Sequence, residues 1–204
     1  MIGALSLPSA GIYTSPAVGS GLIARDSTFS TGQLTSNDAW VWSGDTFFAS
    51  QFVGRTARLY VVYTNGNAGS SFQGDFGLDH IYLPDGAIDN TNTELSTWQY
   101  GSSSSASINN ARNGSWTNVG VFSTSTGGRW NMKTGSTPSS STGPSGAFLF
   151  SYYLYAETSS PTGFNENMWV RSPSFVISIN KYSFYYHGFG ACIGSVSSYV
   201  VIED

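Results

Sequence analysis

From residue 36 onward, the chain is a succession of short runs rich in β-branched and aromatic residues, separated by turn-forming residues. Residues 58–63 (Arg-Leu-Tyr-Val-Val-Tyr) end at the turn sequence Thr-Asn-Gly-Asn, and residues 76–83 end at Pro-Asp-Gly. Such runs are typical of β-strands, and Asn, Asp, Gly and Pro are typical of the turns between them. Further strands are expected at 116–122, 148–155, 175–179, 182–186 and 195–202, with loops at 101–114 and 134–146. The pattern predicts an all-β antiparallel sandwich or barrel with almost no helix.

Composition narrows the classes of function. Only 10% of the residues are charged, so Ser, Thr, Asn, Gly and Tyr must form much of the surface. Extracellular and virion proteins share this feature, although any all-β protein with uncharged polar loops would have it as well. The net charge is -4 and the basic residues are scattered, so no nucleic-acid partner is expected. The apolar runs are too short to cross a bilayer, so no membrane association is expected.

Cys192 is the only cysteine, which excludes an intramolecular disulfide and indicates synthesis in a reducing cytoplasm. Its apolar surroundings predict a small core residue. The first residues have neither the charged start nor the sustained apolar core of a signal peptide.

Residues 1–35 are punctuated by Gly and Pro, but they are too apolar for a solvated tail. We expect an extended N-terminal arm that docks on a partner, followed by a sandwich over residues 36–204. The alternative is that the segment packs along its own domain as an edge strand. The apolar docking candidates are Ile2, Leu5, Leu7, Ile12, Tyr13, Leu22 and Ile23.

The second half of the chain contains a distinctive ordered series. Its parts are 142–144 (Thr-Gly-Pro), 153–157 (Tyr-Leu-Tyr-Ala-Glu), 168–173 (Met-Trp-Val-Arg-Ser-Pro) and 184–190 (Phe-Tyr-Tyr-His-Gly-Phe-Gly). The order and spacing resemble the opening part of a MAM domain. The first half resembles the closing part of the same family, most clearly at 74–81 (Gly-Asp-Phe-Gly-Leu-Asp-His-Ile) and at the tryptophan-containing segment 40–45.

The two parts stand in reversed order. The resemblance therefore implies one circularly permuted, MAM-like jelly-roll sandwich, while two unrelated β-halves remain the alternative. Permutation suits such a fold, because the termini of a sandwich often lie close together. Permuted, cysteine-poor sandwiches of this kind resemble bacteriophage virion components.

The resemblance implies a non-enzymatic virion structural protein, either tail- or fibre-associated or a head decoration. It would dock on other virion proteins, self-assemble into an oligomer and have no required cofactor. The alternative is a carbohydrate-binding or cell-adhesion module that recognises a host-surface glycan. A glycan-degrading enzyme ranks third, because no acid/base pair stands out among Asp75, Asp79, Glu157 and Glu166.

Asp79 and Glu157 lie on the two resembling segments, and the fold analogy brings them together as a candidate structural calcium site. The alternative is that these acids cap turns or pair with Arg58 or Arg171. His187 is expected to be a packed, hydrogen-bonded residue.

Exposed aromatic side chains on a sandwich can stack on sugars or anchor protein contacts. Trp98, Tyr100 and Trp116 flank the Ser-rich loop and are the stacking candidates, with core packing as the alternative for each.

Overall fold

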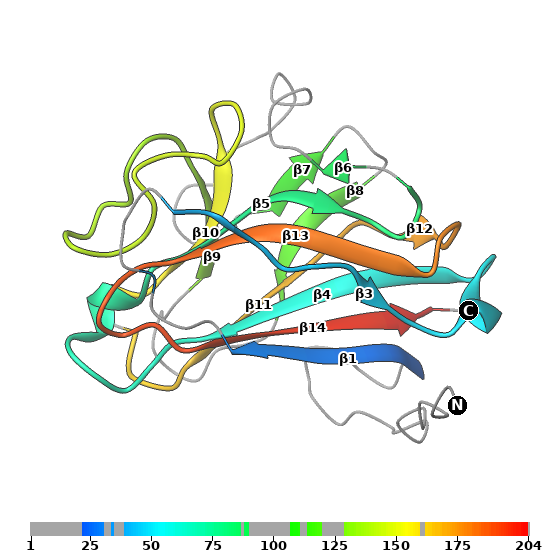
Figure 1. The fold of residues 1–204 in the computed structure, drawn as a ribbon, viewed down its shortest axis with the longest axis horizontal. Coiled ribbons are helices and arrows are strands. Elements are labelled where there is room, and N and C mark those ends of the chain that lie inside the picture. Colours follow the sequence, from blue (N-terminus) through cyan, green and yellow to red (C-terminus); the bar gives the residue numbers. More distant parts are fainter. Residues whose placement is uncertain are drawn as a thin grey trace.

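The computed structural model describes residues 22–30, 34, 39–86, 88–89, 107–110, 114–119, 129–159 and 162–203. These residues form two antiparallel β-sheets that pack face to face (Figure 1). The helical elements in these ranges are the short 3₁₀ turns η1 (Ser50–Phe52) and η2 (Ser71–Gly74). Neither is long enough to span a membrane. An all-β sandwich, the coarse fold class expected from the strand pattern, is confirmed.

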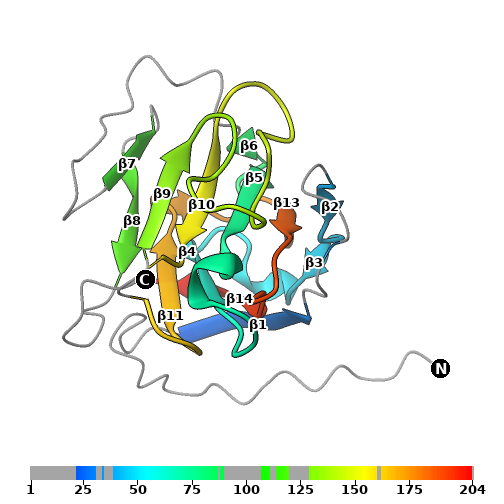
Figure 2. The ribbon, with the colours of Figure 1, turned by 90° about the vertical axis from the view of Figure 1, so that its left-hand side faces the viewer.

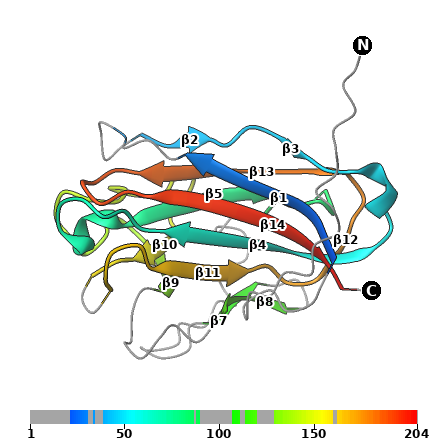
Figure 3. The same ribbon diagram turned by 90° about the horizontal axis from the view of Figure 1, so that it is seen from below.

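The first sheet, sheet A, has the strand order β1-β14-β4-β11-β8-β7, and the short strand β12 also pairs with β4. Seen from below, β1, β14, β4 and β11 lie side by side across its face (Figure 3). Its strands are β1 (Leu22–Ser30), β4 (Thr56–Thr64), β7 (Ser107–Asn110), β8 (Gly114–Val119), β11 (Asn167–Arg171), β12 (Phe175–Val176) and β14 (Ser195–Ile202).

The second sheet, sheet B, has the order β2-β13-β5-β10-β9, with β3 also paired to β13 and β6 to β5. Figure 2 shows this sheet facing sheet A across the core. Its strands are β2 (Val41–Trp42), β3 (Thr46–Phe47), β5 (Phe76–Tyr82), β6 (Ile88–Asp89), β9 (Arg129–Lys133), β10 (Tyr153–Glu157) and β13 (Lys181–Gly188).

Strands from the two halves of the chain interleave at the centre of both sheets. In sheet A, β4 lies between β14 and β11, and in sheet B, β5 lies between β13 and β10. The first half therefore supplies a central strand to each sheet, and the second half supplies the neighbours of both. Residues 39–86 and 129–203 thus build one sandwich with a shared core.

The core follows from the alternation of inward and outward side chains along each strand. In β4, Leu59, Val61 and Tyr63 point inward and are fully buried. The Trp130 indole of β9 is also fully buried, and its Nε1 donates a 2.9 Å hydrogen bond to the Met168 carbonyl of sheet A. This bond ties one edge of sheet B to the opposite sheet.

Two local expectations are wrong. Strand β10 begins at Tyr153 and not at residue 148, because residues 148–151 form bends and Phe150 has a φ of 71°. The apolar residues that precede β10 therefore belong to a covering loop. The expected loop 101–114 contains β7, which forms a hairpin with β8.

The N-terminal segment contributes to the sandwich. Strand β1 runs antiparallel to β14, from Leu22 opposite Ile202 to Ser30 opposite Ser195. Residues 22–30, including the docking candidates Leu22 and Ile23, therefore form an edge strand of their own domain. This is the alternative to partner docking for that part of the segment. The arm candidates Ile2, Leu5, Leu7, Ile12 and Tyr13 lie outside the described residues, so the docking of residues 1–21 stays a prediction.

Candidate functional site

A groove lies on the outer face of sheet B, and its shape follows from strand pairing. Trp42 of β2 is directly opposite Tyr185 of β13, and Ser183 of β13 is opposite Tyr82 of β5. Directly paired residues project from the same face of a sheet. Three aromatic side chains from three adjacent strands therefore gather on the side away from the core.

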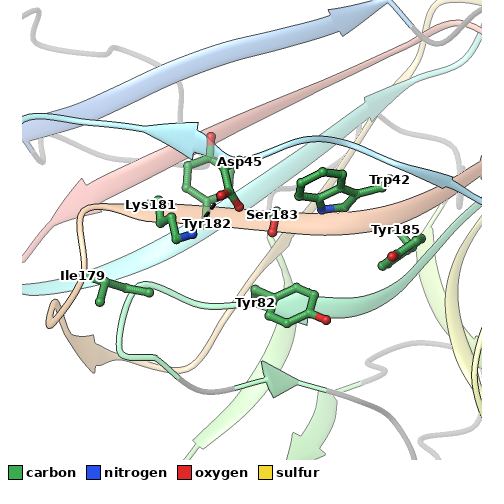
Figure 4. Close-up of a pocket in the computed structure, with 8 residues that line it drawn as sticks. All are labelled: Trp42, Asp45, Tyr82, Ile179, Lys181, Tyr182, Ser183 and Tyr185. Atoms are coloured by element: carbon green, nitrogen blue, oxygen red, sulfur yellow. Dashed lines mark hydrogen bonds and ion pairs between the residues drawn. The ribbon is translucent and has the colours of Figure 1, made fainter.

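The groove has a volume of about 350 Å³. Figure 4 shows Trp42 and Tyr185 at one end, Lys181 and Ile179 at the other, and Tyr82 along one side. Trp42 is 52% exposed although tryptophan is among the largest apolar side chains. A large aromatic group left open to solvent beside polar groups is a feature of ligand-binding surfaces.

The polar end of the groove is formed by an ion pair. Lys181 Nζ lies 2.8 Å from Asp45 Oδ2, and it also lies over the Phe47 ring at 5.9 Å from the centroid. The pair is partly exposed, so its contribution to stability is small. It gives the groove a hydrogen-bond donor and an acceptor with no net charge.

Tyr185 is held in place by an aromatic neighbour from the covering loop. Its ring stacks on Phe148 with centroids 3.8 Å apart and planes 14° apart. Phe148 belongs to the loop that covers the rest of this face, where Trp40 Nε1 also donates a hydrogen bond to the Gly146 carbonyl. This loop covers Trp40 and stops short of Trp42, which explains why only the second tryptophan is exposed.

The covering loop is fixed by Asp79, which is buried in the outer face of β5. Asp79 Oδ2 accepts hydrogen bonds from the backbone N–H groups of Phe148 at 2.9 Å and Leu149 at 3.3 Å, and Oδ1 accepts one from His80 at 2.7 Å. A carboxylate that accepts several backbone N–H bonds holds the segments together strongly. Asp79 therefore positions Phe148, and through it Tyr185.

His80 occupies a β-bulge beside the groove. The pairing of β5 with β13 shifts register between Ser183 and Tyr185, and His80 has a φ of 50°. Its ring contacts Tyr82 edge-on at 5.1 Å. Burial lowers the pKa of His80, so the imidazole is neutral at physiological pH. Bulges commonly redirect side chains next to functional sites.

A second group of acids lies at the opposite end of β5. Asp75 and Glu157 are neighbours where β5 begins and β10 ends. Each carboxylate accepts hydrogen bonds from nearby backbone. Asp75 Oδ1 accepts from the N–H and the hydroxyl of Thr158, both at 3.1 Å. Glu157 accepts from the Ser159 N–H at 2.8 Å and from the Tyr155 hydroxyl at 3.0 Å.

Asp75 is fully buried, and its Oδ2 makes no hydrogen bond to any residue that the structure describes. Burial raises the pKa of Asp75 to about 7, and the neighbouring charge of Glu157 acts in the same direction. The Thr158 hydrogen bonds oppose this shift. Thr137 also lowers the pKa slightly, but its hydroxyl donates to the Thr142 carbonyl and leaves Oδ2 unpaired.

The structure does not bring Asp79 and Glu157 together, which corrects the expectation that they could approach each other. Strand β10 pairs Tyr155 with Gly77 and Ala156 with Phe76, so Glu157 lies beside Asp75. Four residues of strand, about 13 Å, separate that end from Asp79. Within the described ranges, no three His, Cys, Asp or Glu side chains gather closely enough to hold a metal ion.

The acids instead bind backbone N–H groups, in line with the alternative of turn capping. Arg58 forms its ion pair with Glu203, not with the acids of the resembling segments. Glu166 lies on a separate loop, where its N–H donates to Asn65 Oδ1 at 2.8 Å. Both expected packed residues, His187 and Cys192, are fully buried.

The described residues that line the groove are not the predicted stacking residues. Trp98 and Tyr100 lie outside the described residues, and for Trp116 only its place in β8 is described. The groove aromatics Trp42, Tyr82 and Tyr185 were missed as ligand candidates. The signal in the sequence was the spacing of Trp40 and Trp42, which places both on one face of a strand.

Comparison with known proteins gives no assignment: no family profile matches the chain, and no solved structure matches its fold.

Proposed function

We propose that this protein is a non-enzymatic structural protein of a bacteriophage virion, tail- or fibre-associated or a head decoration. It acts by docking and is present in many copies. Its fold is a circularly permuted, MAM-like jelly roll. The proposal combines the sequence resemblance with two structural observations: the order of the strands in the sheets and the roles of the carboxylates.

The interleaving of the two halves supports the permutation. A MAM-like closing half and opening half, joined in reversed order, must still interleave to build one sandwich. The central position of β4 between β14 and β11, and of β5 between β13 and β10, fits this requirement. Two unrelated β-halves would each be expected to form sheets of their own.

One observation favours binding over catalysis. The carboxylates of Asp75, Asp79 and Glu157 all accept backbone hydrogen bonds that fix loops. A glycosidase of the usual kind needs two carboxyl groups that face the substrate. The exposed Trp42 lies elsewhere, in the groove of sheet B.

A truncation tests the docking role. Because β1 begins at Leu22 and pairs with β14, a chain without residues 1–21 retains its edge strand. Virions produced with the full chain and with the truncated chain would be purified, and their protein content measured by mass spectrometry. We expect the full chain in many copies and the truncated chain strongly depleted.

The control is the circular dichroism spectrum of the truncated protein, which should match that of the full chain. Absence of the full chain from purified virions would overturn the virion assignment. Equal incorporation of the folded, truncated chain would overturn docking through the N-terminal arm.

The second candidate function is a carbohydrate-binding or cell-adhesion module. The exposed Trp42 beside the Asp45–Lys181 pair favours this candidate. The two candidates are compatible, because a docked, multicopy protein gains avidity for surface glycans.

A further inference from the structure

We propose that the groove formed by Trp42, Tyr82, Ser183, Tyr185 and the Asp45–Lys181 pair binds a neutral saccharide. This assignment rests on the proposed binding role and names its ligand. Trp42 and Tyr185 provide the aromatic faces, and the ion pair provides the polar contacts.

The size of the groove suits a small sugar unit. Sites for small ligands commonly enclose about 300 to 1,000 Å³, and this groove encloses about 350 Å³. Its aromatic end and its polar end are separated along β13, since Lys181 and Tyr185 are four residues apart on that strand. A sugar ring has one apolar C–H face and a rim of hydroxyl groups, and it matches this division.

The polar groups favour an uncharged, polyhydroxylated ligand. Lys181 donates hydrogen bonds, Asp45 accepts them, and the tyrosine hydroxyls can do either. Because Lys181 and Asp45 pair at 2.8 Å, neither charge is left to select an ion. A sugar hydroxyl is both a donor and an acceptor, so it can bond to both members of the pair without separating them.

The site is built before any ligand arrives. Tyr185 stacks on Phe148, and the Phe148 backbone is bonded to Asp79. Trp42 is fixed at the backbone by its pairing with Tyr185. Binding to such a site loses little conformational entropy, which raises affinity for a ligand that makes few contacts.

A proline-rich peptide is the other occupant that aromatic grooves commonly receive. Such a peptide needs an extended track, but this groove ends at Lys181 and Ile179. The short groove with a polar end therefore favours a sugar, and a peptide becomes an outcome of the test.

The test uses the full chain and the same chain with Trp42→Ala. Both would be screened on an array of neutral and acidic oligosaccharides, and the best neutral oligosaccharide would be titrated by calorimetry. We expect binding by the full chain and at least about a tenfold loss of affinity in Trp42→Ala, because central aromatic contacts usually dominate binding. A proline-rich peptide library would be screened in parallel.

Phe164→Ala is the matched control, because Phe164 is 48% exposed and lies in the loop near Asn65, at the far end of the sandwich. It should leave affinity unchanged. The double variant Asp45→Asn with Lys181→Gln keeps Trp42 and should also weaken binding. Absence of saccharide binding, equal binding by Trp42→Ala, or binding of peptides alone would overturn the assignment. The proposed docking uses residues 1–21 and not this groove, so the proposed virion role would survive that failure.

Discussion

Asp75 gives the structure a measurable dependence of stability on pH. Its carboxyl is fully buried with one oxygen unpaired among the described residues, and burial raises its pKa to about 7 from an ordinary 3.8. The groups that face it are Glu157 and the hydroxyls of Tyr63, Tyr153 and Tyr155. Burial raises the pKa of all three tyrosines, so these stay neutral through the range considered.

Below about pH 4 the carboxyl of Asp75 is protonated in both the folded and the unfolded chain, and it contributes nothing to pH dependence. Between pH 4 and pH 7 the unfolded chain loses this proton while the folded chain retains it, so stability falls as pH rises. The difference between 3.8 and about 7 corresponds to about 4 kcal/mol, at about 1.4 kcal/mol for each pKa unit.

Asp75→Asn isolates this effect. The side-chain oxygen that accepts the two Thr158 hydrogen bonds is preserved, and the ionisable proton is removed. Urea unfolding of both proteins at pH 4 and pH 8 gives four free energies of unfolding. The contributions of titrating groups that do not interact with Asp75 cancel when the change in unfolding free energy between the two pH values is compared for the two proteins. Glu157 does interact with Asp75, so the difference also contains the effect of the substitution on Glu157.

Between pH 4 and pH 8, we expect the free energy of unfolding to fall by about 4 kcal/mol more in the original chain than in Asp75→Asn. A difference near zero would mean that Asp75 ionises normally in the folded chain. A greater fall in the unfolding free energy of Asp75→Asn would mean that the Thr158 hydrogen bonds, which lower the pKa of Asp75, outweigh the effect of burial. Either result would refute the reasoning from the unpaired oxygen.

Three further predictions concern the loops around the sandwich. Asp79→Ala removes the acceptor for the Phe148 and Leu149 N–H groups. It should cost about 2–4 kcal/mol of stability and speed proteolysis within residues 134–152; an unchanged cleavage rate would contradict the role of Asp79 as the loop anchor. Gly190→Ala would place a Cβ 2.1 Å from the Gln73 carbonyl at a φ of 142°. It should cost more than about 2 kcal/mol, while Gly146→Ala, which meets nothing within 4 Å, is the control. Since Asp79 and Glu157 are apart, EDTA should leave the melting temperature unchanged, and a fall restored by calcium would disprove this.

The sandwich itself could be predicted because strand signals are local. Residues 58–63 combine β-branched and aromatic residues with a following turn, and they form the buried centre of β4. The same local signal was misleading at residues 148–152, where the apolar residues belong to a loop that packs on the outer face of sheet B. Periodicity cannot separate a core strand from an apolar covering loop.

The candidate site was harder to predict, because its residues meet only through strand register. Which acid lies beside Glu157 depends on how β10 aligns with β5, and one alignment selects Asp75 where another would select Asp79. Likewise, Trp40 and Trp42 are equivalent in the strand pattern, but the loop that reaches Gly146 covers only Trp40. Register and loop coverage are tertiary properties that local patterns do not contain.

Cryo-electron microscopy of purified virions tests the central claim most directly. The account predicts many copies of a two-sheet sandwich on the tail, fibre or head, with residues 1–21 in contact with a neighbouring subunit and Trp42 facing outward. Virions that lack this density would contradict the proposed virion role. Density in which the groove is buried against another virion protein would contradict its proposed role as a saccharide site.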